Sequence, residues 1–319
     1  MRTPLMETVP CPICGSPDFE LSFELPDRLD PSGRWKLVRS TSCGLLMLNP
    51  RPGVTEIHDY YHKGPDGAYD PHLHETLARS PRDRIYLFAR RLLLHRKASL
   101  VLHTEKKAAG DLRVLEIGCS TGDLLNHLHR KKGIPAENLA GVETDARAAG
   151  IAESHSGITI YRTGIDEMEK EMRFDRIVFW HALEHLHDLN GVLAGTAGRL
   201  ERNGTVVVAL PNPESRDARR YRENWVAWDA PRHLWHFTPA TLAELLAAHG
   251  LEIFWTTPWI ADTLYTCWYS GKLAAAARGR RFGFPAMADA LLQSALGVAA
   301  SLFRIRQAST LVYFIRRRG

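Results

Sequence analysis

Seven short apolar runs, separated by stretches with helical spacing, constrain the fold of this 319-residue chain more than any other feature. They are LRVLEIG (112–118), LAGVE (139–143), ITIYR (158–162), FDRIVFW (174–180), GTVVVAL (204–210), LEIFWTT (251–257) and STLVYFI (309–315). Nearly continuous Val, Ile and Leu strands that alternate with helices are typical of a mainly parallel sheet covered on both faces. We expect an α/β doubly wound domain over residues 111–319, with seven strands and the last pair antiparallel at one edge.

The first run ends in EIGCSTG and leads directly into a helical pattern. Small residues at Gly118, Ser120 and Gly122 leave room for a ligand beside the backbone, and free N–H groups lie at the helix start. The next run ends in Glu143, whose carboxylate can accept hydrogen bonds from both hydroxyls of a ribose. The spacing is neither the dinucleotide G-x-G-x-x-G nor a P-loop. Together these features favour a nucleotide-type cofactor over a purely structural turn.

Four segments in order then resemble one family. VLEIGCSTG, GVETD, FDRIVFWHALEHLHD and LERNGTVVVALPNPES are similar to the successive motifs of class I S-adenosylmethionine-dependent methyltransferases, over roughly residues 111–257. The branch resembled includes ubiquinone-biosynthesis O-methyltransferases and sugar and natural-product methyltransferases. The fold implied is Rossmann-like, with S-adenosylmethionine as cofactor.

The resemblance also implies roles for residues at the carboxyl ends of successive strands, where ligands of open α/β sheets bind. Glu116, Gly118 and Gly122, with Ser120 between them, would lie along the methionine part of the cofactor, and Glu143 would bind its ribose. Ile165 and Asp166 would meet the adenine, and Trp180 and His181 would face the sulfonium.

The string HALEH (181–185) spells H-x-x-E-H, a zinc signature of some metalloproteases. Here it follows a buried strand rather than lying on a helix, and a protease would leave the glycine turn without a role. Some relatives carry ExxEH and bind a divalent ion there; His181 replaces the first Glu, which would favour zinc, iron or nickel over magnesium. His181 or His185 could instead act as acid, base or substrate orienter. A bracing role for Glu184 and His185 is the remaining alternative.

The loop WVAWDAPRHLWHFTP (225–239) is dense in Trp and His. A loop of this composition near the carboxyl ends of the strands suits an aromatic or sugar acceptor. His233 and His236 are therefore further catalytic candidates, and structural histidines that brace the loop are the alternative.

CPICGSPDF and RSTSCGLLMLNPRP resemble a small zinc ribbon that precedes such methyltransferase domains. Cys11 and Cys14 form one knuckle, but Ser40 stands where the second knuckle would have a Cys, with Cys43 after it. Three thiolates remain for a zinc that prefers four ligands, unless His58 or His62 joins them. The Tyr60-Tyr61 pair would belong to a lid over the cofactor.

Composition sets the remaining expectations. Five cysteines and a start without an apolar signal region predict a cytoplasmic protein, and no run reaches the 18 apolar residues that span a bilayer. A net charge of +5 is too small for a nucleic-acid surface. We expect a ribbon-like segment (1–52), a lid and linker (53–110) with an amphipathic helix from about Arg82 to His103, and the methyltransferase domain (111–319).

A helical insert at about 260–308 could pack in the core, form a dimer face or a substrate lid, or touch an acidic membrane surface. The oligomeric state stays open. The function expected is methyl transfer to an oxygen or carbon of a small molecule, such as a sugar, a lipid-linked glycan or a natural product. An RNA methyltransferase and a non-catalytic cofactor-binding protein are the alternatives.

Overall fold

The computed structural model describes residues 6–30, 32–61, 81–103, 105–165 and 168–319. Asp166, predicted to meet the adenine, and His62, a candidate zinc ligand, lie outside the described residues.

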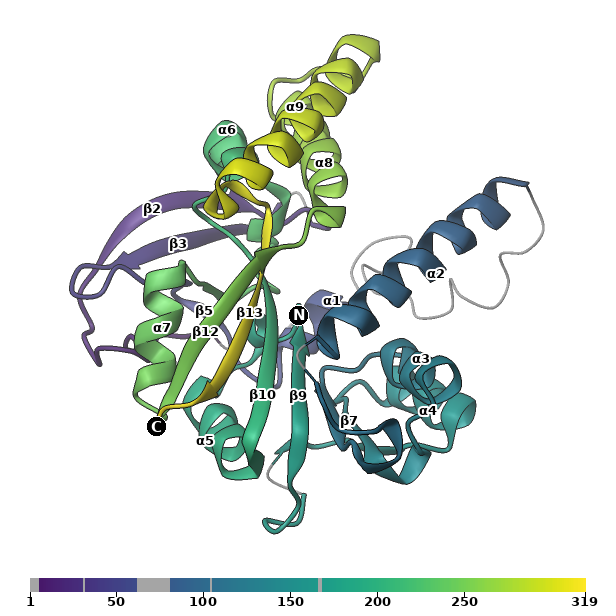
Figure 1. Cartoon of the computed structure of the whole chain (residues 1–319). Helices are drawn as coiled ribbons and strands as arrows, with labels where there is room; N and C mark the ends of the chain where they lie inside the picture. Colours follow the sequence, from purple (N-terminus) through teal and green to yellow (C-terminus); the bar gives the residue numbers. More distant parts are fainter. Residues whose placement is uncertain (1–5, 31, 62–80, 104, 166–167) are drawn as a thin grey trace.

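The core of the molecule is a seven-stranded sheet (Figure 1). In spatial order its strands are β12 (Leu251–Pro258), β13 (Thr310–Arg317), β10 (Leu200–Pro211), β9 (Phe174–Trp180), β6 (Val114–Ile117), β7 (Leu139–Val142) and β8 (Thr159–Tyr161). Every predicted apolar run forms one of these strands. Only β13 runs against its neighbours, pairing antiparallel with both β10 and β12. The predicted α/β class, with an antiparallel pair at one edge, is confirmed.

Helices cover both faces of this sheet, because alternate residues of each strand point to opposite sides. Val206, Val208 and Leu210 of β10 pack with α5 (Leu189–Arg199) and α7 (Pro239–Ala247). Val207 and Ala209 join the core formed with α2 (Pro81–Val101), α3 (Asp123–Lys132) and α4 (Ala146–Ser156). Figure 1 shows these two groups of helices on opposite sides of the strands. The packed helices on both faces therefore fix the positions of the strands and of their carboxyl ends.

A second, four-stranded sheet lies beside the first. It contains β2 (Phe19–Pro26), β3 (Arg34–Ser40), β4 (Leu46–Leu48) and β11 (Trp235–His236). Short strands β1 (Met6–Glu7) and β5 (Arg51–Pro52) pair separately, and α1 (Ile57–Tyr61) follows them. Because β11 comes from the His-rich loop after β10 and pairs with β4, the segment predicted as a ribbon shares a sheet with the catalytic candidates.

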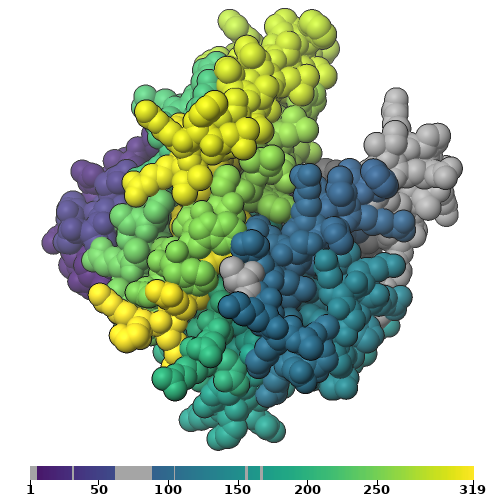
Figure 2. Space-filling view, viewed as in Figure 1, coloured from purple at the N-terminus to yellow at the C-terminus, as the bar shows by residue number. Residues whose placement is uncertain are grey.

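The helical insert is a hairpin of α8 (Ala261–Ala277) and α9 (Phe284–Phe303), which packs on the short helix α6 (Arg216–Tyr221). It projects from the rest of the molecule at the top of Figures 1 and 2. Within the described part of the chain, α9 is the one helix long and apolar enough to cross a membrane by length and composition, a weak indication when found once.

Candidate active site

The predicted glycine turn follows β6 directly. Gly118 and Gly122 have φ angles of 72° and 73°, and Ser120 between them has 49°, so the chain passes through the left-handed region three times. A Cβ at Gly118 would lie 2.7 Å from the Cβ of Ala182. Glycine at 118 is therefore required both by the backbone conformation and by the close approach of the HALEH segment.

Glu143 closes β7 beside this turn. Its carboxylate accepts hydrogen bonds from the backbone N–H groups of Ser120 (2.8 Å) and Asp145 (2.9 Å). Burial raises the pKa of Glu143, and these N–H bonds oppose the shift. The side chain is thus fixed over the glycine turn, where the ribose was predicted to bind.

Glu116, in β6, is only 2% exposed. Its Oε1 lies 3.0 Å from the Nζ of Lys97 in α2, whereas its Oε2 is buried with no hydrogen-bond partner among the described residues. Burial raises the pKa of Glu116, and the charge of Lys97 partly offsets this. A buried acceptor without a partner is costly, so this oxygen fits an incoming donor such as the ammonium of a bound methionine group.

Lys97 also lies over the Trp180 ring, with Nζ 5.0 Å from the ring centroid. The ammonium can pair with the carboxylate of the same methionine group, since Lys is a compact, mobile cation. Sequence reasoning missed Lys97, because only the packing of α2 against α3 brings it to β6. The unpaired Oε2 of Glu116, the glycine turn and Glu143 together fit S-adenosylmethionine.

His181 is the first residue after β9 and has a φ angle of 53°. Its Nε2 lies 2.9 Å from Oδ2 of Asp262, in the first turn of α8, and its Nδ1 lies 3.4 Å from Oε1 of Glu184. Asp262 is held in turn by the Thr310 hydroxyl (2.7 Å) and the indole N–H of Trp259 (3.1 Å). Sequence reasoning also missed Asp262, which lies far along the chain in the helical insert.

These two carboxylates control the charge of His181. Burial by itself would lower the pKa of His181, but the hydrogen bonds and charges of Asp262 and Glu184 outweigh it and raise the pKa to about 10. At neutral pH the imidazole is therefore protonated. His181 is suited to donating hydrogen bonds and orienting its neighbours, and unsuited to the general-base role that was one of its predicted options.

The other three histidine candidates gather around Glu184. The ring centroids of His185 and His233 are 4.6 Å apart, and those of His233 and His236 are 6.2 Å apart. Glu184 is 1% exposed; burial alone would raise its pKa, but other interactions, first among them the hydrogen bond from His181, lower it to about 2. All the predicted catalytic histidines thus lie in one group at the carboxyl edge of the sheet.

Hydrogen bonds to backbone carbonyls determine which nitrogen of each ring carries the proton. Nδ1 of His185 lies 3.0 Å from the Arg232 carbonyl, and Nδ1 of His233 lies 2.8 Å from the Ala227 carbonyl. A carbonyl only accepts, so both Nδ1 atoms donate and both Nε2 atoms keep a lone pair when neutral. Burial lowers the pKa of His233 to about 4 and that of His236 to about 3, so both are neutral at pH 7.

Glu184, His185 and His233 offer ligand atoms that all lie within 4.8 Å of one another. Oε2 of Glu184 has no hydrogen-bond partner in the described ranges. Two imidazoles and one carboxylate are a donor set that suits zinc or iron better than magnesium. The group could therefore hold a divalent metal, which was one of the options for the H-x-x-E-H string, with His233 as the additional ligand and His181 outside the set.

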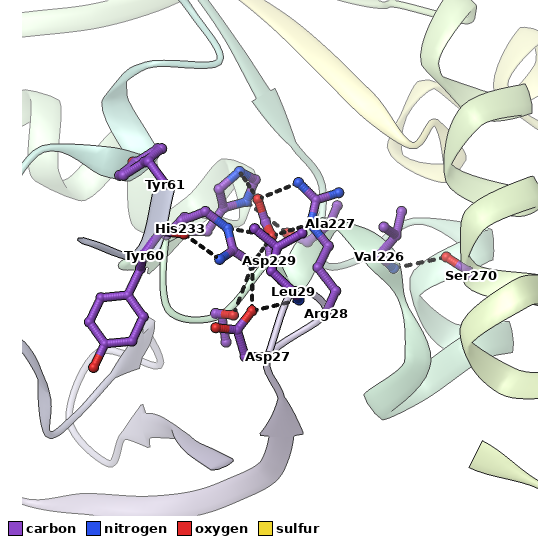
Figure 3. A network of polar contacts seen from close by, with 12 residues as sticks. Asp27, Arg28, Leu29, Tyr60, Tyr61, Val226, Ala227, Asp229, His233 and Ser270 are labelled. Atoms are coloured by element: carbon purple, nitrogen blue, oxygen red, sulfur yellow. Dashed lines mark hydrogen bonds and ion pairs between the residues drawn. The ribbon is translucent and has the colours of Figure 1, made fainter. Parts of the chain in front are cut away.

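A buried ionic network around Asp229 lies beside His233 (Figure 3). Arg232 is fully buried, and its Nη2 lies 3.0 Å from Asp27 and 2.7 Å from Asp229. Its Nη1 donates to the Tyr60 carbonyl at 3.0 Å, and Arg28 pairs with Asp229 at 2.7 Å. The network ties the N-terminal sheet and α1 to the loop that carries His233.

The Tyr60-Tyr61 pair, predicted to form a lid, divides between two environments. The Tyr60 ring packs edge-on against Trp35 in the N-terminal core, whereas the Tyr61 hydroxyl lies 2.9 Å from Nδ1 of His185. Figure 3 shows the two rings pointing apart. Tyr61 is the member of the pair that reaches the histidine group.

Ile165 lies in the hydrophobic core and is 2% exposed, and a Cβ added at Gly195 of α5 would lie 3.0 Å from its side chain. Contact of Ile165 with an adenine ring would therefore come from its backbone.

The three N-terminal cysteines lie together. Sγ of Cys11 and Sγ of Cys43 are 3.4 Å apart, and Sγ of Cys14 is 3.4 Å from the Ser40 hydroxyl. The three sulfurs lie within 4.8 Å of one another, and no histidine of the described residues joins them. Burial raises the pKa of Cys11 to about 11; burial would also raise that of Cys14, but the Ser40 hydroxyl and other hydrogen bonds lower it to about 7. The three sulfurs lie close enough together to hold one metal ion between them.

The sheet order, with one reversed strand between β10 and β12, and the glycine turn faced by an acidic residue at the end of the next strand define a class I S-adenosylmethionine-dependent methyltransferase. The family described as "Methyltransferase domain" matches residues 78–254, more than half of the chain, and the chain belongs to this family.

The relatives that the chain matches include ubiquinone biosynthesis O-methyltransferases. The chain is 30% identical to that of Rhodopseudomonas palustris (strain HaA2) over 154 residues, 44% of this chain and 59% of the relative. It is 32% identical to that of Bradyrhizobium diazoefficiens over 105 residues, 32% of this chain and 41% of the relative. The chain thus spans less than two thirds of these relatives.

Among solved structures, magnesium protoporphyrin IX methyltransferase from Synechocystis PCC 6803, with bound SAH, has a TM-score of 0.50 and 11% identity. The match covers 84% of this chain and 100% of the other. At this identity the likeness concerns the fold.

Proposed function

We propose that this protein transfers a methyl group from S-adenosylmethionine to a hydroxyl oxygen of a small molecule. The observation that carries the proposal is the histidine and carboxylate group placed next to the glycine turn, through the contact of Gly118 with Ala182. The similarity to O-methyltransferases supports oxygen as the acceptor atom.

The cofactor supplies an activated methyl on its sulfonium. Glu116 and Lys97 would hold the methionine group, and Glu143 the ribose hydroxyls. Alignment of acceptor and methyl supplies most of the rate enhancement in such a transfer. The chain's remaining task is to place the acceptor hydroxyl and take its proton.

His185 is the residue we assign as general base. Its side chain is only partly buried, unlike those of His233 and His236, so an acceptor can reach it. Its Nδ1 donates to the Arg232 carbonyl, so Nε2 keeps the lone pair that accepts a proton. The buried carboxylate of Glu184 stabilises the imidazolium that forms. His181, already protonated between Asp262 and Glu184, orients this carboxylate.

A metal at Glu184, His185 and His233 is the second candidate for the same chemistry, because their ligand atoms lie within 4.8 Å. A metal would lower the pKa of a bound acceptor hydroxyl and make a base unnecessary. Transfer abolished by a chelator and restored by zinc or iron would favour this assignment over a histidine base.

The test separates binding from transfer. The cofactor is titrated calorimetrically into the wild type, Glu143→Ala and His185→Gln, and S-adenosylhomocysteine formation is measured with fractions of a cell extract as acceptors. We expect Glu143→Ala to weaken binding by about 3 kcal/mol or more, because each of the two lost charge-assisted hydrogen bonds is worth about 1.5–3 kcal/mol. His185→Gln should bind normally and slow transfer by about 10²–10⁴-fold. Tight binding by the wild type without turnover in any fraction would support the cofactor-binding alternative instead.

A further inference from the structure

Helix α9 exposes its large apolar side chains and buries small and polar ones, which is the reverse of an ordinary helix in a soluble protein. Its buried residues are small or polar: Ala290, Gln293, Ser294, Gly297 and Ser301. Its large apolar residues point to solvent and are 42% to 89% exposed: Phe284, Leu291, Leu292, Leu296, Leu302 and Phe303. An apolar stripe at helical spacing normally faces the core. In α9 the large apolar residues instead lie on the side of the helix that faces solvent.

Helix α8 repeats the pattern. Its buried residues are Thr263, Thr266, Cys267, Ser270 and Ala275, all small or polar, while Leu264, Tyr265 and Tyr269 are exposed. The small inner side chains allow the two helices to pack closely, and a Cβ at Gly297 would lie 2.9 Å from the Thr263 methyl group. The hairpin therefore presents apolar side chains from both of its helices to the outside.

The polar side chains on the inner face of the hairpin form hydrogen bonds within the fold. The Ser270 hydroxyl accepts from the Val226 N–H at 2.9 Å, and Gln293 accepts from Arg216 at 2.7 Å. The Ser294 hydroxyl donates to the Ala290 carbonyl at 2.7 Å. Because these groups are satisfied, the exposure of the outer face is a property of the folded hairpin, and such patches mark interaction sites.

The net charge of the hairpin indicates which kind of surface its exposed apolar face contacts. Residues 259–307 contain six basic and two acidic residues, a net of +4 in a chain whose total is +5. Exposed arginines flank α9 at both ends: Arg278, Arg280 and Arg281 in the turn before it, and Arg304 and Arg306 after it. Both acidic residues are engaged, Asp262 with His181 and Asp289 with Arg220. An apolar face bordered by basic side chains complements an anionic lipid surface.

We propose that the outer face of the α8–α9 hairpin docks on an anionic membrane surface, with the helices lying in the plane of the interface. The polar side of α9 is committed to α8 and α6, so this helix cannot expose all its sides to lipid as a spanning helix does. A second copy of the same face would bring the flanking arginines together, which disfavours self-association. Tyr265 and Tyr269 suit the headgroup level.

Co-sedimentation of the full chain with vesicles tests the proposal. Vesicles of phosphatidylcholine are compared with vesicles that also contain about 30% phosphatidylglycerol, at low and high salt. We expect binding to the anionic vesicles only, weakened by salt. Leu296→Glu and the double variant Arg280→Glu/Arg281→Glu should each bind at least about tenfold more weakly.

Leu92→Glu in α2 is the matched control, because Leu92 is 47% exposed and Leu296 is 42% exposed. It should bind vesicles like the wild type. Both sites are on the surface, so circular dichroism should show all variants folded. Absence of wild-type binding, equal loss in Leu92→Glu, or a dimer in sedimentation velocity that Leu296→Glu dissociates would each overturn the proposal. Vesicle binding requires neither cofactor nor turnover, so this result is independent of the proposed methyl transfer.

Discussion

Replacing Arg232 with Met removes the cation at the centre of the buried network and should destabilise the whole protein. The guanidinium makes contacts of 2.7 Å to Asp229, 3.0 Å to Asp27 and 3.0 Å to the Tyr60 carbonyl. Met fills similar volume, so the main loss is electrostatic. Two carboxylates that are 2% and 7% exposed stay behind.

Breaking a buried ion pair by removing one partner costs about 3–5 kcal/mol. Arg28 still neutralises Asp229 at 2.7 Å, whereas Asp27 keeps no other cation among the salt bridges of the described residues. We therefore expect a loss of about 3–4 kcal/mol at pH 7, a large share of the 5–15 kcal/mol that stabilises a typical protein.

The loss should depend on pH. Burial by itself would raise the pKa of Asp229, but Arg28 and Arg232 outweigh it and hold the pKa well below its usual range. A lowered folded-state pKa means that this stabilisation is present above the unfolded value of about 3.9 and disappears as the pH falls through the folded value. The variant lacks one of the two cations that lower the pKa of Asp229, so the difference from the wild type should be smaller at pH 4 than at pH 7.

Urea unfolding followed by tryptophan fluorescence measures both quantities. The control is Arg39→Met, whose partner Glu20 lies 3.8 Å away with both side chains exposed, and it should cost less than about 1 kcal/mol. If Arg232→Met and Arg39→Met unfold at the same urea concentration at pH 7, the network does not hold the N-terminal sheet to the loop that carries His233 as argued.

Three further results are expected. Gly118→Ala should lose about 2–4 kcal/mol of stability and its cofactor affinity, from a strained φ of 72° and a 2.7 Å overlap, while Gly157→Ala, with a φ of 62° in open space, should lose only about 1 kcal/mol by thermal unfolding. Asp262→Asn should weaken proton binding by His181 about tenfold or more, because it removes the carboxylate 2.9 Å away; an NMR titration that still gives a pKa near 10 would contradict this. Purified protein should contain zinc that a chelator removes with a fall in Tm, and Cys14→Ser should reduce zinc affinity by at least about tenfold; equal metal content in both proteins would refute the three-thiolate site.

The central sheet was predictable because its signal is local. Each strand is a short apolar run, and the turn at Gly118 and the acid at Glu143 follow the runs directly. The carboxyl ends of parallel strands meet at one edge, so the motifs could be placed together without knowledge of any side-chain contact. The grouping of His181, His185, His233 and His236 follows from the same rule.

The roles of those histidines were not predictable, since each depends on neighbours distant in the chain. His181 is charged because Asp262 approaches from the helical insert, and His233 is neutral because it is buried. Lys97 reaches Glu116 only through the packing of α2. Identical side chains in one pocket thus acquire different protonation states from tertiary contacts that no motif records.

Periodicity likewise predicts which residues share a face of a helix but not the direction in which that face points. Leu242 and Leu246 of α7 and Leu292 and Leu296 of α9 have the same i, i+4 spacing, yet the first pair is buried and the second is exposed. The discriminating signal lies on the opposite side of α9, where Ser294, Gly297 and Ser301 recur at helical spacing. Small residues at that spacing allow close helix packing, so they mark the inner face and leave the leucines outside. Where a helix has one face of large apolar residues and one of small residues, the small residues indicate the buried face, because only they fit where the helices touch.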